Sequence, residues 1–254
     1  MTGKLDTARV FERIFEIYRD QFTLLVPAAF AVFLLVAIVV GVLVSVAEVL
    51  GGIIALLLAI AVTFLYQGMV VEAARDILDG RRDHTIGSLI SSVTPVLAPL
   101  VGASILAGLG IVLGFIALIV PGLFLLTIWA LIAPVIVLER VGAMDSFGRS
   151  RELVRGNGWR VFGVILVLVV LQMVLVSVVQ SVFGAISDSF LLYGLADLLV
   201  RGLIAPLSAL GVAVMYFELK AIRGEPVPGS ETYRPPATAP GQPAPQAGER
   251  PPGA

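Results

Sequence analysis

The sequence has no cysteine, a single histidine and little charge. Without cysteine the chain has no disulfide, no thiolate nucleophile and no cysteine-ligated metal site. We interpret the one histidine, His84, as a solvated residue of a polar turn and not as a metal ligand. Phosphate-binding loops, dinucleotide fingerprints and nucleophile elbows are absent as well. We therefore predict that the protein is not an enzyme and requires no cofactor.

Charged residues make up 14% of the chain, hydrophobic residues make up 58%, and the mean hydropathy is +1.02. A soluble domain carries about 25% charged and about 45–50% apolar residues. The polar residues are too few to cover a water-soluble particle, so the composition indicates a polytopic membrane protein. The formal net charge of −1 gives no reason to expect binding to nucleic acid.

Six apolar runs are long enough to cross the ~30 Å hydrocarbon core of a bilayer as helices. The predicted spans are about 22–44, 51–71, 96–120, 121–138, 161–186 and 198–217. Pro121-Gly122 is the predicted tight reversal between the third and fourth spans, and Trp129 is expected to pack against other helices near mid-membrane. The sequence thus predicts an all-α fold over 1–224, followed by a disordered Pro-rich tail over 225–254 that contributes nothing to the fold.

Shorter amphipathic segments precede the spans. One is Ala8–Asp20, capped by Asp6 or Thr7, and a weaker one follows Thr85. A third starts at Asp145 or Ser146 and ends at Gly156. In it Met144, Phe147 and Val154 are the expected apolar contacts, and Arg149, Glu152 and Arg155 are expected to face water or headgroups. A unit of amphipathic segment plus two spans therefore occurs three times, which either duplication or simple alternation explains.

The basic residues predict the orientation. With six spans, sixteen of the seventeen lysines and arginines fall on one side of the membrane, and Arg201 is the exception. Basic residues concentrate on the cytoplasmic side of membrane proteins. We therefore predict a multi-pass protein of the cytoplasmic (inner) membrane with both termini in the cytoplasm.

A few polar residues within or beside the spans have a predicted structural role. Gln67 and Gln180 are interpreted as contacts between helices, and Glu139 as a polar residue at a span's inner end. Asp197 and Arg201 have the spacing of an i,i+4 ion pair, although Arg201 would also suit an anion or substrate at the outer mouth. The Gly110–Gly114 motif is expected to serve packing within the chain and not dimerisation.

Four arginines of the central connection, Arg149, Arg151, Arg155 and Arg160, are candidates for binding anionic lipid headgroups. They would equally serve to enforce topology. Membrane lipids and membrane proteins are the partners this composition suggests. The favoured function is a membrane-organising or lipid-interacting role. A transporter or channel for a small or amphipathic solute is the alternative, and an accessory membrane domain for a phosphodiesterase is a further one.

The central connection also carries a recognisable pattern. It comprises Pro121-Gly122, Pro134, Glu139, Gly142, Arg149-Ser150, Leu153, Gly156 and Trp159. This pattern resembles the membrane-domain family of glycerophosphoryl diester phosphodiesterase and the uncharacterised six-span bacterial proteins of the YciC type, over about residues 5–224. The resemblance implies a polytopic inner-membrane protein. It implies no reaction, because that family is named for members fused to a phosphodiesterase barrel and this chain leaves no room for one.

Overall fold

The computed structural model describes residues 3–78, 86–186 and 189–226, and all regular elements in these ranges are helices. His84 and the tail beyond residue 226 lie outside the described residues. The helices are α1 (Thr7–Asp20), α2 (Phe22–Val46), α3 (Glu48–Leu78), α4 (Ile86–Val93), the 3₁₀ turn η1 (Thr94–Val96), α5 (Leu97–Ala117), α6 (Ile119–Ile128), α7 (Ile132–Glu139), α8 (Ala143–Val154), α9 (Gly158–Ile186) and α10 (Phe190–Ile222).

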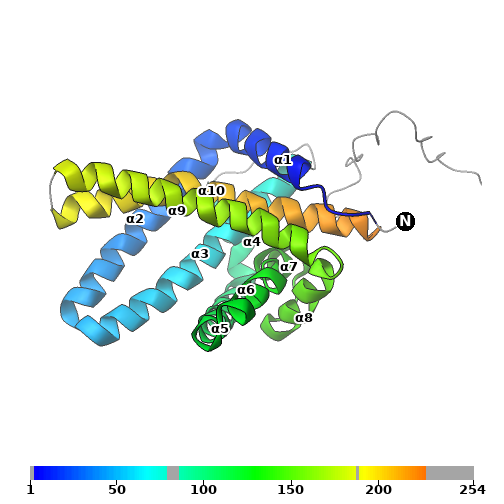
Figure 1. Ribbon diagram of the computed structural model, residues 1–254, viewed down its shortest axis with the longest axis horizontal. Helices are drawn as coiled ribbons and strands as arrows, with labels where there is room; N and C mark the ends of the chain where they lie inside the picture. Colours follow the sequence, from blue (N-terminus) through cyan, green and yellow to red (C-terminus); the bar gives the residue numbers. More distant parts are fainter. Residues whose placement is uncertain (1–2, 79–85, 187–188, 227–254) are drawn as a thin grey trace, which may run out of the picture.

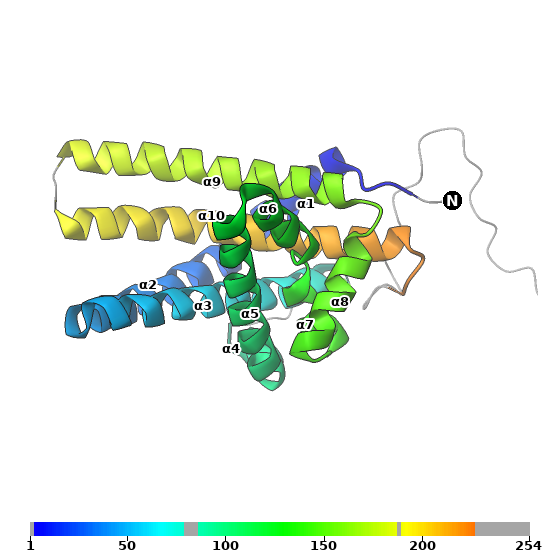
Figure 2. The same ribbon diagram turned by 60° about the horizontal axis from the view of Figure 1, so that its bottom comes forward.

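Within these described ranges six segments are long and apolar enough to cross a membrane, so the prediction of an all-α polytopic protein is confirmed. They form three hairpins, α2–α3, α5 with α6–α7, and α9–α10, and a shorter helix precedes each one. The hairpins diverge from a common base formed by α1, α7, α8 and the C-terminal end of α10 (Figure 1). The α5–α6 hairpin runs across the direction of α9 and α10 (Figure 2).

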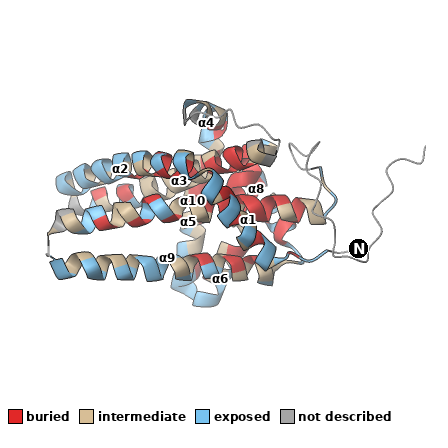
Figure 3. Cartoon of the chain, turned by 90° about the horizontal axis from the view of Figure 1, so that it is seen from above, coloured by how far each residue is buried: buried red, intermediate tan, exposed pale blue. Residues whose placement is uncertain are grey.

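Helix α10 is the centre of the packing. It contacts α1, α2, α3, α7, α8 and α9, and its buried residues form much of the hydrophobic core at the base (Figure 3). Two glycines allow the close approach of neighbouring helices. A Cβ at Gly202 would lie 2.6 Å from the ring of Phe30, and one at Gly211 would lie 2.6 Å from Leu168. The helix begins at Phe190, before the predicted start of the span at 198, and it includes the Asp197–Arg201 pair.

The reversal between α5 and α6 occurs at Leu118 and not at the predicted Pro121-Gly122. Leu118 has extended backbone angles, whereas Pro121 lies in the first turn of α6, where a proline forfeits no intrahelical hydrogen bond. The Gly110–Gly114 motif packs within this hairpin as predicted. A Cβ at Gly110 would lie 2.6 Å from Trp129, and one at Gly114 would lie 3.0 Å from the Cα of Gly122.

The fourth predicted span is not one helix. Helix α6 ends at Ile128, and α7 begins at Ile132 with Pro134 in its first turn. Proline has no N–H to continue the helix across this point, which accounts for the break. Trp129 lies at the break and packs edge-on against Phe147 of α8, with ring centroids 5.0 Å apart. Its predicted packing role is therefore confirmed.

The two longer segments at the base agree in part with the sequence. Asp6 caps α1 by accepting hydrogen bonds from the backbone of Ala8 and Arg9, and one side of α1 is buried at Val10, Ile14 and Ile17. Helix α8 begins at Ala143, earlier than predicted, and Gly156 follows it with the expected positive φ of 90°. In α8 Val154 is buried by the protein, whereas the side chain of Met144 is exposed.

Candidate functional site at the base of the hairpins

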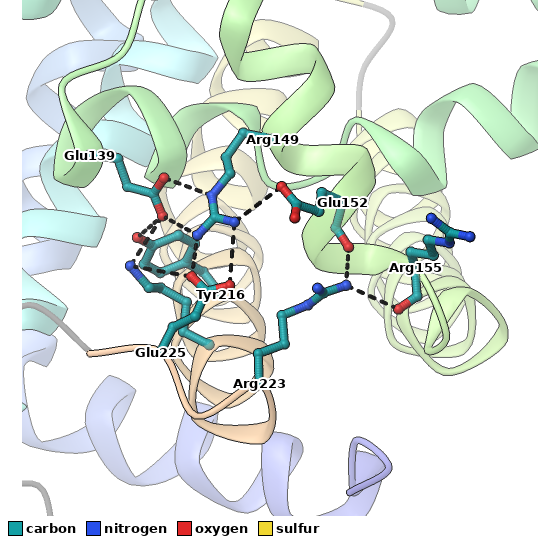
Figure 4. A network of polar contacts seen from close by, with 8 residues as sticks. Glu139, Arg149, Glu152, Arg155, Tyr216, Arg223 and Glu225 are labelled. Atoms are coloured by element: carbon teal, nitrogen blue, oxygen red, sulfur yellow. Dashed lines mark hydrogen bonds and ion pairs between the residues drawn. The ribbon is translucent and has the colours of Figure 1, made fainter. Parts of the chain in front are cut away.

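A network of polar contacts joins α7, α8 and the end of α10 (Figure 4). Arg149 of α8 holds Glu139 of α7 with two hydrogen bonds, Nε to Oε2 at 2.8 Å and Nη2 to Oε1 at 3.2 Å. This two-point geometry is the strongest form of the arginine–carboxylate pair. The expectation that Arg149 faces water or headgroups is therefore wrong, and its side chain is only 21% exposed.

Glu139 receives two further hydrogen bonds from α10. Tyr216 donates its hydroxyl to Oε1 at 2.9 Å, and Lys220 donates Nζ to the same oxygen at 3.1 Å. Lys220 is 8% exposed and also lies over the ring of Tyr216. Glu139 thus compensates two cations that the fold holds away from water. These contacts agree with the structural role that the sequence predicts for Glu139.

Glu225 completes the network. Its carboxylate pairs with Arg149, and Nζ of Lys220 lies 4.0 Å from it. Hydrogen bonds to Glu139 and Glu225 raise the pKa of Arg149 above its ordinary value, so this guanidinium stays charged. The sequence assigns Glu225 to the tail, but its contacts belong to the helical domain.

Ser150 bridges the break between α6 and α7. Its hydroxyl donates to the carbonyl of Ile128 at 2.8 Å and accepts from the backbone N–H of Leu131 at 3.2 Å. These groups have no helical partner at the break, and a buried backbone group without a hydrogen bond is costly. The sequence places Ser150 in the central pattern but assigns it no role. The feature of the sequence that could have identified it is its helical spacing, which puts Ser150 on the buried face of α8 with Ser146, Leu153 and Val154.

The loop between α8 and α9 is tied to both chain ends of the domain. Arg223 donates to the carbonyls of Glu152 and Arg155. Asn157 accepts from the N–H of Leu5 at 2.9 Å, and Arg160 donates to the carbonyl of Leu5 at 2.5 Å. These hydrogen bonds hold the loop in one conformation beside the first residues of the chain.

The four predicted arginines therefore divide into two groups. Arg149 and Arg160 bond to the protein, whereas the side chains of Arg151 and Arg155 are exposed and bond to none of the described residues. Lys4 is exposed beside them and likewise has no partner among residues 3–78, 86–186 and 189–226. Arg151, Arg155, Arg160 and Lys4 are called the basic rim below.

The other predicted polar residues take no part in this network. Asp197 and Arg201 form the predicted pair, with Nε 2.5 Å from Oδ2. Gln67 and Gln180 are half-buried, and neither makes a hydrogen bond within the part of the chain that the structure describes. Likewise, no group of three His, Asp or Glu side chains among those residues could hold a metal ion.

Comparison of the chain with protein-family models, with curated proteins and with solved structures finds no match. At the base the fold uses Arg149 and Arg160 to position α8 and the 156–160 loop, and it presents Arg151, Arg155 and Lys4 outward.

Proposed function

We propose that the protein is a non-enzymatic integral protein of the cytoplasmic membrane that binds anionic lipid headgroups at the base of its hairpins. The observation that carries this proposal is the basic rim, where Arg151, Arg155 and Lys4 are exposed and unpaired among the described residues. Each basic residue held at an anionic leaflet adds about 1 kcal/mol of attraction. The rim lies where α9 begins, at the boundary between a charged segment and an apolar one.

Coupled transport is the less favoured function. An ion-coupled carrier places ionisable groups along its route through the membrane. In the described parts of the candidate spans most ionisable side chains lie toward the ends, and Asp197 and Arg201, which lie farther in, pair with each other. This distribution favours a function at the membrane surface.

The lipids that accompany the purified protein test the proposal. Mass spectrometry of protein extracted in mild detergent is expected to find anionic phospholipids enriched severalfold over their share of the source membrane. Retention is expected to fall as ionic strength rises, because salt screens exposed charges. A co-purifying lipid mixture with the same composition as the membrane would contradict the proposal. The arginines would then serve only to set the orientation of the protein in the membrane.

Orientation is tested by single cysteines, since the chain has none of its own. Ser45 lies near the turn of α2–α3 and Ser189 lies at the turn of α9–α10, whereas Ser92 lies in α4. With the base in the cytoplasm, Ser45→Cys and Ser189→Cys should react with a membrane-impermeant thiol reagent added to intact cells, and Ser92→Cys should react only after lysis. The reverse pattern would place the basic rim on the outer face.

A further inference from the structure

A groove runs from the basic rim along α6. One cavity of about 770 Å³ lies between α6 and the first turns of α9, and a second of about 540 Å³ lies between α6 and α8. Both are lined by Phe124, Ile128, Gly156 and Gly158, so they adjoin. Figure 2 shows α6 beside the start of α9, next to α8. The larger volume lies within the range of ~300–1,000 Å³ that small-molecule sites occupy.

The lining changes character along the groove. The wall from α6 is apolar at Val120, Leu123 and Phe124, and Phe162 of α9 faces it. At the loop end Lys4 and Arg160 line the larger cavity, and Arg151 and Arg155 line the smaller one. The acid at this end, Glu152, directs its carboxylate toward Arg149 at 3.3 Å. The groove is therefore apolar along α6 and cationic at the loop.

We infer that the groove holds one anionic glycerophospholipid, with an acyl chain along α6 and the phosphate at the basic rim. This inference rests on the proposed function, and it identifies the groove as the one site where the headgroup is bound. A ligand with a long apolar part and an anionic end matches the lining at both ends, whereas a free anion would leave the apolar wall unused. Trp159 is 86% exposed on the rim, which is where an aromatic residue contacts the headgroup region.

The rim is preorganised for this role. Arg223 holds the backbone of α8 and of Arg155, and the contacts of Asn157 and Arg160 with Leu5 hold the next turn. Less ordering is then required when a headgroup binds. Among the described residues the guanidinium of Arg160 makes one hydrogen bond, to the carbonyl of Leu5, so its remaining donors are available to a phosphate.

The test is native mass spectrometry of the full-length protein titrated with phosphatidylglycerol or with phosphatidylcholine of the same acyl chains. Wild-type protein is expected to retain one tightly bound phosphatidylglycerol. Arg151→Gln/Arg155→Gln is expected to weaken its binding about thirtyfold. Arg9→Gln/Arg19→Gln removes two exposed charges from α1, outside the groove, and is expected to change binding less than threefold.

The apolar end is tested separately. Leu123→Trp fills the groove and is expected to weaken phosphatidylglycerol binding about tenfold, while millimolar inorganic phosphate displaces little lipid from wild-type protein. If Leu123→Trp binds normally, or if inorganic phosphate displaces the lipid, the rim is an anion site without an acyl groove and the inference is wrong. If Leu123→Trp alone binds as wild type does, the inference fails while the proposed function stands. If Arg151→Gln/Arg155→Gln also binds as wild type does, the basic rim holds no headgroup and the proposed function fails with the inference. If wild-type protein shows no preference for the anionic lipid, the proposed function fails too.

A second readout requires no change to the groove. In a Trp129→Phe background Trp159 is the only remaining tryptophan, because the chain has two. Phosphatidylglycerol with a brominated acyl chain is expected to quench its fluorescence at a mole fraction about tenfold lower than brominated phosphatidylcholine does. Equal quenching by the two lipids would overturn the assignment of an anionic lipid to this groove.

Discussion

Glu139→Gln is expected to lower the free energy of unfolding in detergent by about 3 kcal/mol, the low end of the range for breaking a buried ion pair. The carboxylate of Glu139 accepts from Arg149, Tyr216 and Lys220, and the neutral amide leaves two cations without their anion. Arg149 retains Glu225, which is why the low end applies. Reversible unfolding in mixed micelles, followed by circular dichroism, measures the loss.

Glu152→Gln is the matched control. Glu152 also contacts Arg149, at 3.3 Å, but its side chain is 59% exposed, so its loss should cost less than about 0.5 kcal/mol. Lys220→Met in the Glu139→Gln background should recover part of the lost stability, because it removes a buried cation that keeps only the 4.0 Å contact with Glu225. Equal effects of the two glutamate substitutions would show that the network does not stabilise the base.

The sequence predicts those features of this fold that depend on neighbouring residues. Uncharged runs of sufficient length identify the six candidate spans, and the spacing of Asp197 and Arg201 identifies their pair. The cap at Asp6 and the glycine at Gly156 follow from the same local rules. Each of these signals lies within a few residues of the structure that it predicts.

Features that depend on distant residues were not predicted. From its position in the amphipathic pattern of α8, Arg149 could face water. Only the fold brings Glu139 of α7 and Glu225, 76 residues away, to its guanidinium. Pro121-Gly122 predicts a turn, but a proline is equally suited to the first turn of a helix, which is where Pro121 lies. The sequence identifies three of the four residues of the basic rim, but it does not show which of the four predicted arginines bond to the protein itself.

Loss of the Ser150 hydroxyl is the second substitution that we expect to lower the stability of the fold substantially. Ser150→Ala removes both hydrogen bonds at the break between α6 and α7, and leaves the carbonyl of Ile128 and the N–H of Leu131 without these partners. Leu131 is fully buried, so water does not replace the lost bond. We expect a loss of about 1–3 kcal/mol in the free energy of unfolding, the cost of an unsatisfied buried group.

Ser146→Ala is the control for that substitution. Ser146 is as buried as Ser150 and lies one turn earlier in α8, but its hydroxyl donates to the carbonyl of Ala143 within the same helix. Its loss should cost less than about 1 kcal/mol, because no group at the break depends on it. Hydrogen exchange at the amide of Leu131 separates the two variants directly: we expect it to accelerate at least tenfold in Ser150→Ala and to remain unchanged in Ser146→Ala. Unchanged exchange in both would mean that the break is held by the packing of Trp129 and Phe147, and not by Ser150.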